Sequence, residues 1–280
     1  MTDLGRSLRD TLATGARLST PAVVERDVST DGTTKFVLAL ADRRRIEAVY
    51  IPDTPKQTFC ISTQVGCAMK CAFCLTGKMG LARNLTAGEI AGQVRVLARE
   101  TGLLDRAFNI VLMGMGEPLH NYDETMKALR ILNDEQGLAV SLHATTDEMR
   151  EQLVPVNRKY GLQDLMDACR MFPLKRRNRI TFEYVLLEGV NDTPEDARRL
   201  VALLAGSKAK VNLLPLNEAA GIPFTRPSDA RVNRFAGILA DHHVTVMVRK
   251  SRGRDIRAAC GQLIVEGTER SPAQRLAERI

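Results

Sequence analysis

The sequence contains no apolar run that approaches the roughly 18 residues of a membrane-spanning helix. Residues 1–20 include Asp3 and Asp10 and lack the apolar core of a secretory signal peptide. There is no internal repeat, and 20 Gly with 11 Pro among 280 residues are too few for a collagen-like or low-complexity chain. These absences predict a globular protein that acts in the cytoplasm without touching a membrane, where its six cysteines serve as thiols, ligands or catalysts.

Positive charge is concentrated in two short segments. The sequence has 40 Lys and Arg against 33 Asp and Glu, a net charge of +7. The first basic segment, residues 175–179, and the second basic segment, residues 249–257, together account for this excess, so the rest of the chain is close to neutral. Such segments predict a binding site for a polyanion, with a pair of solvated loops as the alternative.

Hydrophobic patterning changes at about residue 58. Between residues 23 and 52, apolar and polar residues alternate, which predicts β-strands, and Asp31-Gly32 marks a turn. After residue 58, apolar strands alternate with helices, an order typical of parallel strands joined by crossover helices. The predicted strands span residues 58–63, 108–113, 138–142, 180–187, 211–215 and 244–248.

Capping residues mark several helix starts. Thr86 with Glu89 predicts a capping box. Thr193 with Pro194 in the first turn opens a second helix, and Ser228 caps a third. Two further helices are predicted at residues 123–133 and 162–172. The chain is therefore expected to be an α/β protein.

Three cysteines with the spacing CxxxCxxC are the strongest chemical signal. Cys67, Cys71 and Cys74 follow directly after a predicted strand, and in an α/β barrel the loop after a strand lies on the functional face. Zinc usually takes four ligands, and the next histidine is as distant as His120. Three thiolates suit a [4Fe–4S] cluster that leaves one iron open for an exogenous chelate. Cys169, in contrast, falls on the apolar face of a predicted helix, so we assign it to the core.

CxxxCxxC is the signature of the radical S-adenosylmethionine enzymes, and the surrounding sequence narrows the match. Six segments carry it, in order: residues 64–67, 71–74, 77–85, 114–118 (GMGEP), 141–144 (SLHA) and 258–263 (AACGQL). From about Thr33 to Leu263, the chain resembles the bacterial dual-specificity adenine-C2 RNA methyltransferases. The resemblance implies methylation of adenosine C2 in ribosomal RNA and transfer RNA, with a [4Fe–4S] cluster, S-adenosyl-L-methionine and an electron donor for the cluster.

The resemblance assigns catalytic roles to three residues. Cys260 accepts a methyl group from one S-adenosylmethionine, and a radical derived from a second removes a hydrogen from that S-methyl group. The methylene radical adds to adenine C2, an electron-poor carbon that cannot itself attack a sulfonium methyl group. Cys60 then releases the RNA by forming a disulfide with Cys260, and Glu47 accepts the proton. The residues alone leave open a buried, structural Cys60 and a solvent-facing Glu47.

The resemblance also implies how the cofactors are held. Cys67, Cys71 and Cys74 ligate the cluster. The glycines of the GMGEP segment let the backbone approach a ligand closely, and its glutamate can hold the cofactor's ammonium group. Taken by itself, a histidine such as His143 is more often structural. The implied cofactor-binding residues are Gly116, Glu117, Ser141, Leu142, His143 and Asn217.

The implied fold is a partial (β/α) radical S-adenosylmethionine barrel with a small N-terminal β extension. This chain departs from the family in two places. Most of the helical accessory region is absent, and about one βα unit, which carries a cofactor-binding serine in relatives, is missing before Ser141. We expect a contracted barrel in which strand 108–113 pairs with strand 138–142. The expected domains are residues 1–57 (accessory remnant and β extension), 58–265 (radical core) and 266–280 (tail).

Two alternatives to this function remain. The first is a shortened, non-catalytic relative that binds an iron–sulfur cluster or RNA, and the two missing regions favour it. The second is methylation of adenosine at C8 instead of C2, which would use the same cysteines.

Overall fold

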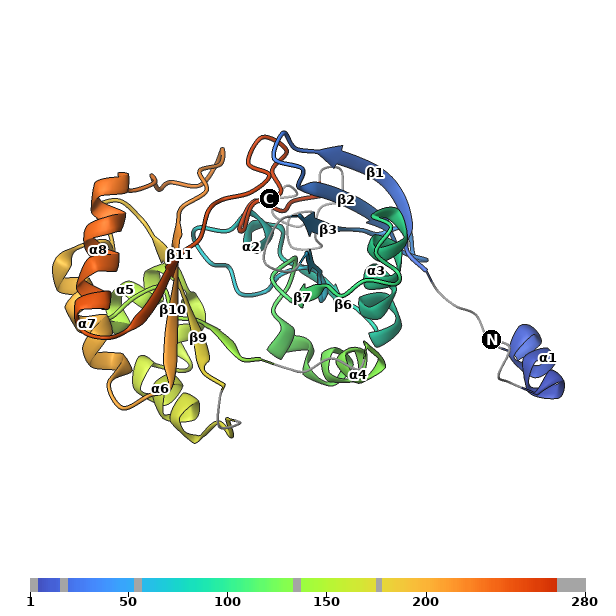
Figure 1. Ribbon diagram of the computed structural model, residues 1–280, viewed down its shortest axis with the longest axis horizontal. Coiled ribbons are helices and arrows are strands. Elements are labelled where there is room, and N and C mark those ends of the chain that lie inside the picture. The colour runs from blue at the N-terminus through green and yellow to red at the C-terminus, as the bar shows by residue number, and fades with distance from the viewer. Residues whose placement is uncertain (1–4, 16–19, 53–56, 133–136, 175–177, 266–280) are drawn as a thin grey trace, which may run out of the picture.

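The computed structural model describes residues 5–15, 20–52, 57–132, 137–174 and 178–265. Two β-sheets lie side by side, each with helices on its outer side (Figure 1). The predicted α/β fold is confirmed. The order of elements also follows the predicted change at residue 58, since antiparallel strands come first and alternating strands and helices follow.

The first sheet has five strands in the order β1-β2-β3-β4-β7. The predicted N-terminal β extension is its antiparallel part, and β4 pairs with β7 in parallel. One face packs Phe36, Ala48 and Phe59 into an apolar core that includes Ile90 and Leu97. The strands are β1 (Ala22–Val28), β2 (Thr34–Ala39), β3 (Arg45–Ile51), β4 (Thr58–Cys60) and β7 (Asn109–Val111), and the helices are α3 (Ala87–Glu100) and α4 (Tyr122–Leu132).

The second sheet has four parallel strands in the order β11-β10-β9-β8. Its outer face buries Phe182 and Tyr184 against Leu200 and Phe235. Cys169 belongs to the same core, as predicted. The strands are β8 (Ala139–Ser141), β9 (Ile180–Leu186), β10 (Ala209–Pro215) and β11 (Thr245–Val248), and the helices are α6 (Leu162–Met171), α7 (Pro194–Leu204) and α8 (Asp229–Asp241).

The predicted helix starts are confirmed. Thr86 and Glu89 form a reciprocal capping box at the start of α3. Thr193 does the same at the start of α7, with Asp196 as its partner. Ser228 accepts a backbone hydrogen bond at the start of α8. These caps satisfy N–H groups that have no partner within the helix.

A short hairpin lies beside the first sheet and was not predicted. It pairs β5 (Gln64–Gly66) with β6 (Leu81–Asn84), and α2 (Leu75–Met79) lies in the connection between these strands. The other elements are α1 (Arg6–Gly15), α5 (Asp147–Leu153) and two single 3₁₀ turns, Pro118–Asn121 and Pro155–Arg158. The hairpin matters because the connection between its strands contains all three cysteines of the CxxxCxxC motif.

β7 and β8 do not pair with each other. Each is the last strand of its own sheet, so the prediction that they join to contract the barrel is wrong. A missing strand leaves a gap of about two strand spacings of roughly 4.8 Å. Closing that gap would pull β7 from its ladder with β4, or β8 from its ladder with β9, and disturb one of two separate cores.

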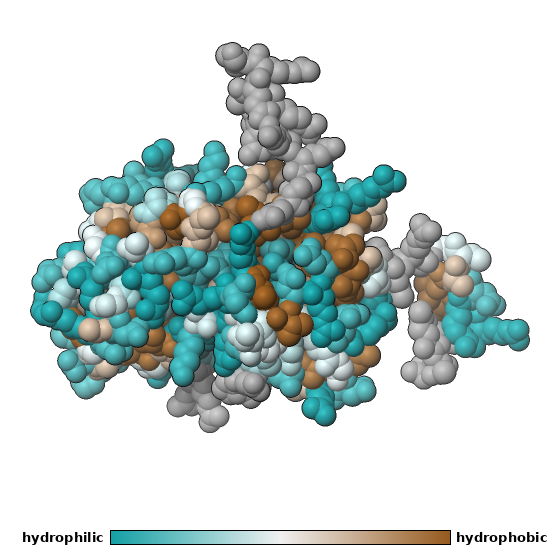
Figure 2. Space-filling view, turned by 90° about the horizontal axis from the view of Figure 1, so that it is seen from above, coloured by the Kyte–Doolittle hydropathy of each residue, from teal (hydrophilic) through white to brown (hydrophobic). Residues whose placement is uncertain are grey.

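The surface is predominantly hydrophilic on the face shown in Figure 2, where apolar residues gather in small groups. Among the described residues, no helix is long and apolar enough to cross a membrane. The division into residues 1–57, 58–265 and 266–280 stays a prediction. Strands from both sides of its first boundary share one sheet, and residues 266–280 lie outside the described part of the chain.

Candidate functional site

The cluster loop, residues 67–74, runs from the end of β5 to the start of α2. Cys67 is buried, and Cys71 and Cys74 are partly buried. Gly66 has φ +77° and can have no side chain, because a Cβ there would lie 1.9 Å from the carbonyl oxygen of Gly80. The Ala72 N–H donates to the carbonyl oxygen of Leu153, which attaches the loop to the end of α5.

Burial raises the pKa of the Cys67 thiol and raises that of Cys71 to about 12. The charge of Cys74 raises the pKa of both thiols further, so the three cysteines lie close together. No set of three or more His, Cys, Asp or Glu side chains in the described residues forms a cage for a single metal ion.

The segment that carries Cys260 is hydrogen-bonded to the helix that follows the cluster loop. Leu75 N–H donates to the carbonyl oxygen of Gly261 at 2.7 Å, and Thr76 Oγ1 donates to that of Leu263 at 2.7 Å. Cys260 itself is exposed, and its carbonyl oxygen accepts from Asn217 Nδ2 at 3.2 Å. The surrounding protein still raises the pKa of its thiol.

Cys60 and Glu47 share the inner face of the first sheet, opposite the face that packs on α3. Val49 of β3 pairs with Cys60 of β4, and Glu47 lies two residues from Val49 on the same side of β3. Ala258 and Leu263, on either side of Cys260, belong to the apolar cluster that includes Cys60. Burial raises the pKa of the Cys60 thiol, and the charge of Cys260 raises it further. The structure thus brings these three predicted residues to one region.

Glu47 is only 2% exposed. Its Oε1 lies 3.5 Å from Lys35 Nζ, and its Oε2 accepts from Ile264 N–H at 2.8 Å. Burial raises the pKa of Glu47 to about 7, and the charge of Lys35 is the largest opposing effect. The carboxyl can therefore gain or lose a proton near neutral pH. The interpretation of Glu47 as a solvent-facing strand residue is wrong.

The GMGEP segment follows β7 and packs tightly on the end of β4. Gly116 has φ +101°, and a Cβ there would lie 2.6 Å from Cβ of Gln64. A Cβ at Gly114 would lie 2.7 Å from the carbonyl carbon of Ile61. Gln64 Oε1 accepts from Glu117 N–H at 2.9 Å. Burial raises the pKa of Glu117. The negative charge of Glu117 in turn raises the pKa of Cys67 and of Cys71.

Ser141, Leu142 and His143 lie at the end of β8, and they face different ways. Ser141 is exposed, whereas the Leu142 side chain is fully buried in the outer core, so only its backbone faces the site. His143 has φ +60°, an uncommon backbone conformation for a residue with a side chain. Its Nδ1 accepts from Val185 N–H at 3.1 Å, and burial lowers its pKa to about 3. The His143 ring is therefore neutral.

A buried arginine that the sequence analysis did not single out holds this strand end in place. Arg150 Nε donates to the carbonyl oxygen of Leu142 at 3.1 Å, and Nη2 donates to that of Ser141 at 3.2 Å. Its Nη1 donates to Asn157 Oδ1 at 2.6 Å. The charge of Cys71 acts to raise the pKa of Arg150. The Arg150 side chain therefore interacts with both the end of β8 and the cluster loop.

Glu183 and Asn212 were also missed. Ser141, Glu183 and Asn212 are register partners on β8, β9 and β10, on the face opposite the outer core. Asn212 Nδ2 donates to Glu183 Oε1 at 2.8 Å, which leaves Asn212 Oδ1 buried without a partner. Asn217 Oδ1 is also buried without a hydrogen-bond partner. The sequence did contain a signal for Glu183, because it is a charged residue within the mostly apolar strand predicted at residues 180–187.

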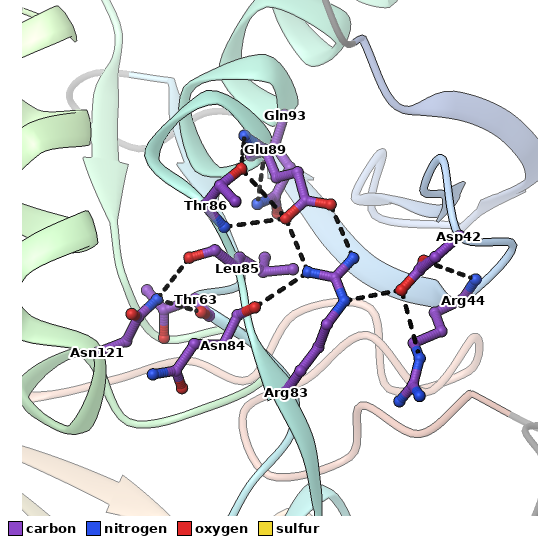
Figure 3. A network of polar contacts seen from close by, with 10 residues as sticks. All are labelled: Asp42, Arg44, Thr63, Arg83, Asn84, Leu85, Thr86, Glu89, Gln93 and Asn121. Atoms are coloured by element: carbon purple, nitrogen blue, oxygen red, sulfur yellow. Dashed lines mark hydrogen bonds and ion pairs between the residues drawn. The ribbon is translucent and has the colours of Figure 1, made fainter.

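A polar network supports the hairpin beside the cluster loop (Figure 3). Arg83 of β6 donates to both carboxylate oxygens of Glu89 at 2.8 Å each and to Asp42 at 2.8 Å. Asn121 Nδ2 donates to the carbonyl oxygens of Thr63 and Leu85, at 2.9 and 2.8 Å. The network holds β6, and hence β5, at the base of the cluster loop.

The second basic segment connects β11 to Cys260. Its Asp255 accepts from Ser29 Oγ at 2.6 Å and from Thr30 N–H at 3.2 Å, which attaches it to the turn between β1 and β2. Arg249 and Lys250 are exposed. Of the first basic segment, residues 175–177 lie outside the described residues, and Arg179 donates to Thr245 Oγ1 at 2.7 Å.

The chain is similar over most of its length to proteins of one family. No family model matches the chain. It is 47% identical to the dual-specificity RNA methyltransferase RlmN of Anaeromyxobacter dehalogenans, over 99% of this chain and 84% of that protein. It is 49% identical to the RlmN of Syntrophotalea carbinolica, over 98% of this chain and 81% of that protein. A crystal structure of a radical SAM methyltransferase from Sphaerobacter thermophilus superposes with a TM-score of 0.87 at 43% sequence identity. The match covers 94% of this chain and 86% of that chain.

The first of these alignments also bears on the missing unit. It spans 312 residues, whereas this chain has 280, so at least 32 aligned positions of that relative have no counterpart here. That number is close to the size of one βα unit, roughly 30 residues. The absence of one βα unit before Ser141 stays a prediction.

Proposed function

Because this chain belongs to the RlmN family of dual-specificity RNA methyltransferases, we propose that it methylates C2 of adenosine in ribosomal RNA and transfer RNA. The cofactors are a [4Fe–4S] cluster and S-adenosylmethionine. Cys67, Cys71 and Cys74 hold the cluster, and their thiols lose protons when it binds. When bound, the cluster and S-adenosylmethionine supply a carbon-centred radical; the remaining steps belong to residues of the chain.

The residues that would hold S-adenosylmethionine are those of the GMGEP segment and of the end of β8. Glu117 would hold its ammonium group, and the backbone of residues 116 and 141–143 would lie against it. Asn212 and Asn217 each present a buried acceptor oxygen without a hydrogen-bond donor. A ligand that fills this space must bring hydrogen-bond donors, and the hydroxyl groups of a ribose are such donors.

Cys260 carries the methyl group to adenine. Its thiol would take a methyl group from one S-adenosylmethionine, and this S-methyl group would lose a hydrogen atom to the radical that the cofactors supply and add to C2. The hydrogen at C2 would leave as a proton to Glu47, and the adduct would return one electron to the cluster. The thioether that results links RNA covalently to Cys260.

Cys60 breaks this link. Attack of the Cys60 thiol on the Cys260 sulfur gives a disulfide, while the bridging carbon takes a proton and leaves on adenine as a methyl group. Atoms and electrons balance, since thioether plus thiol become methyl group plus disulfide. An external electron donor then reduces the disulfide for the next turnover.

RNA binds through phosphate contacts with the second basic segment. Because this segment leads into Cys260 and is attached to the turn between β1 and β2, bound phosphates lie on the same side as the exposed thiol. The first basic segment contributes further contacts. In this proposal the radical core is an open α/β arrangement, in which β7 and β8 are each the last strand of their own sheet.

The observation that carries the proposal is the assembly of Cys60 and Cys260 beside the cluster loop. Its test is the Cys60→Ala variant, incubated without oxygen with cluster, reductant, S-adenosylmethionine and RNA. We expect it to accumulate an RNA adduct on Cys260, detectable by mass spectrometry. Cys260→Ala should form none, and Cys169→Ala, altered in the outer core, should turn over normally. Absence of adduct from a variant that still cleaves S-adenosylmethionine would exclude this role.

A second candidate is a relative that binds an iron–sulfur cluster or RNA without turnover. The alignment to RlmN of Anaeromyxobacter dehalogenans motivates it, because at least 32 aligned positions of that protein have no counterpart in this chain. Such a protein would take up iron but show no affinity for S-adenosylmethionine. Methylation at C8 is distinguished by the position of the methyl group in the RNA product.

A further inference from the structure

We propose that Lys35 and Asp27 carry the proton that Glu47 takes from adenine into a charged cavity, separate from the catalytic cysteines. The proposal rests on the proposed role of Glu47 as proton acceptor. It assigns a positioning and relay function to two residues of the N-terminal β extension. In this reading, the extension completes the acid–base part of the site.

The three side chains lie in one line across three neighbouring strands. Asp27 of β1 and Lys35 of β2 are register partners, and Lys35 lies diagonally across from Glu47 of β3. Lys35 Nζ lies 3.2 Å from Asp27 Oδ2 and 3.5 Å from Glu47 Oε1. Exposure of the side chains rises along the line, from 3% at Glu47 through 12% at Lys35 to 34% at Asp27. The line therefore runs from the interior toward solvent.

A cavity of about 430 Å³ borders all three side chains. At roughly 30 Å³ per water molecule, it has room for on the order of ten waters. In the described part of the chain, none of the six cysteines lines it. A proton released there reaches water without crossing the region of Cys60 and Cys260. The lining residues are Glu25, Asp27, Lys35, Val37, Arg45, Glu47, Asp255, Ile256, Arg257, Ile264 and Val265.

The proton balance is simple. At rest, Glu47 and Asp27 are carboxylates and Lys35 is an ammonium ion between them. When Glu47 gains the C2 proton, Lys35 gives one of its protons to Asp27 and receives the proton of Glu47. Asp27 then releases a proton to the cavity water, and the resting charges return. No electron moves in these steps.

Other charged groups face Glu47 from every neighbouring element. Arg45 lies on its own strand, Asp27 on β1, and Asp255 and Arg257 on the C-terminal segment. Lys35 is the cation in contact with the carboxylate, so it is the group that keeps Glu47 ready to accept a proton. An ion pair that served only to join strands would not need to lie beside a cavity.

The test compares Lys35→Met with Lys35→Arg in the reconstituted enzyme. The measured quantities are the pH dependence of methylation and, separately, the titration of Glu47 in the resting protein by carboxyl ¹³C NMR. An opposite charge at this distance shifts a pKa by roughly one to three units. We therefore expect Lys35→Met to lose about five-fold or more of its rate at pH 7 and to regain it at higher pH. Lys35→Arg keeps the positive charge but cannot pass on a proton, so the titration of Glu47 should stay close to the wild type while methylation slows. Arg45→Met, a control on the cavity wall, should match the wild type in both measurements.

Asp27→Asn separates relay from simple charge tuning. Removing the Asp27 charge lowers the pKa of Glu47, so tuning alone would move the pH profile to lower pH and leave its plateau unchanged. A relay predicts a lower plateau despite that shift. An unchanged plateau, or a Glu47 titration that is identical in Lys35→Met, would overturn the proposal. Full methylation by Glu47→Gln would instead refute the proposed base, a different result from either of these.

Discussion

Leu75, the residue after the last cysteine of the cluster loop, donates its N–H to the carbonyl oxygen of Gly261, the residue after Cys260, at 2.7 Å. The two residues are 186 positions apart in the sequence. This bond, with that of Thr76 to Leu263, makes the Cys260 segment part of the wall around the cluster loop. The position of the methyl-carrying thiol therefore depends on the helix that follows the cluster ligands.

Loss of the Thr76 hydroxyl should loosen this connection. Thr76→Val leaves the carbonyl oxygen of Leu263 without its donor, at a cost of about 1 kcal/mol in the free energy of unfolding. We expect several-fold slower methylation of Cys260, measured by mass spectrometry of the protein, with unchanged iron content. Thr101→Val removes an equivalent 2.7 Å bond at the end of α3, and it should lower stability without slowing methylation. Equal methylation rates in both variants would contradict this connection.

A side chain at Gly116 should prevent cofactor binding. A Cβ there lies 2.6 Å from Cβ of Gln64, and its φ of +101° disfavours any L-residue. We expect Gly116→Ala to lose roughly 1–3 kcal/mol of stability and most of its affinity for S-adenosylmethionine, measured by calorimetry. Gly237→Ala is the control, because its Cβ meets no atom within 4 Å on α8. Wild-type affinity in Gly116→Ala would rule out this segment as the methionine site.

Glu47 should make folding stability depend on pH. Burial raises its pKa from 4.5 to about 7, so between these values the folded protein binds more protons than the unfolded chain. The stability linked to this protonation is fully present below pH 4.5 and is lost as pH rises through about 7. At about 1.4 kcal/mol per pKa unit, Glu47→Gln should gain about 3 kcal/mol over the wild type between pH 4 and pH 8. Urea denaturation at several pH values measures this gain, and a constant difference would contradict the raised pKa.

The second basic segment should govern the salt dependence of RNA binding. Each phosphate contact contributes about 0.7–0.9 to the slope of log K against log salt concentration. Replacing Arg249, Lys250 and Arg252 with Gln should therefore reduce the slope by about 2. Arg170→Gln with Arg198→Gln, on the outer helices α6 and α7, should leave it unchanged. An unaltered slope in the triple variant would mean that the segment is a solvated loop.

Sequence reasoning succeeded where a signal is local. Thr86 with Glu89 and Thr193 with Pro194 predicted helix starts correctly, because a cap and its partner lie within one turn. The CxxxCxxC spacing is a local signal too, and the cluster ligands that it indicates stay a prediction. The alternation around Glu47 correctly predicted that it lies on a strand. It did not predict that Glu47 is buried, because Ile264, which bonds to its carboxylate, lies 217 residues later in the sequence.

Features that depend on distant partners were missed or misjudged. The separation of β7 from β8 follows from two independent cores, neither of which is visible in the pattern of either strand. Arg150 appears in the sequence as an ordinary helical arginine, yet it is 5% exposed and bonded to the end of β8. Glu183 and Asn212 become a pair only through the register of β9 and β10.

The measurement that tests the central claim most directly is product analysis of the wild-type protein. The cluster is reconstituted without oxygen, and reductant, S-adenosylmethionine and an RNA substrate are added. We predict 5′-deoxyadenosine together with 2-methyladenosine in the digested RNA, identified by mass spectrometry against standards. An iron-loaded protein that forms neither product would contradict the account, and 8-methyladenosine would contradict the assigned position.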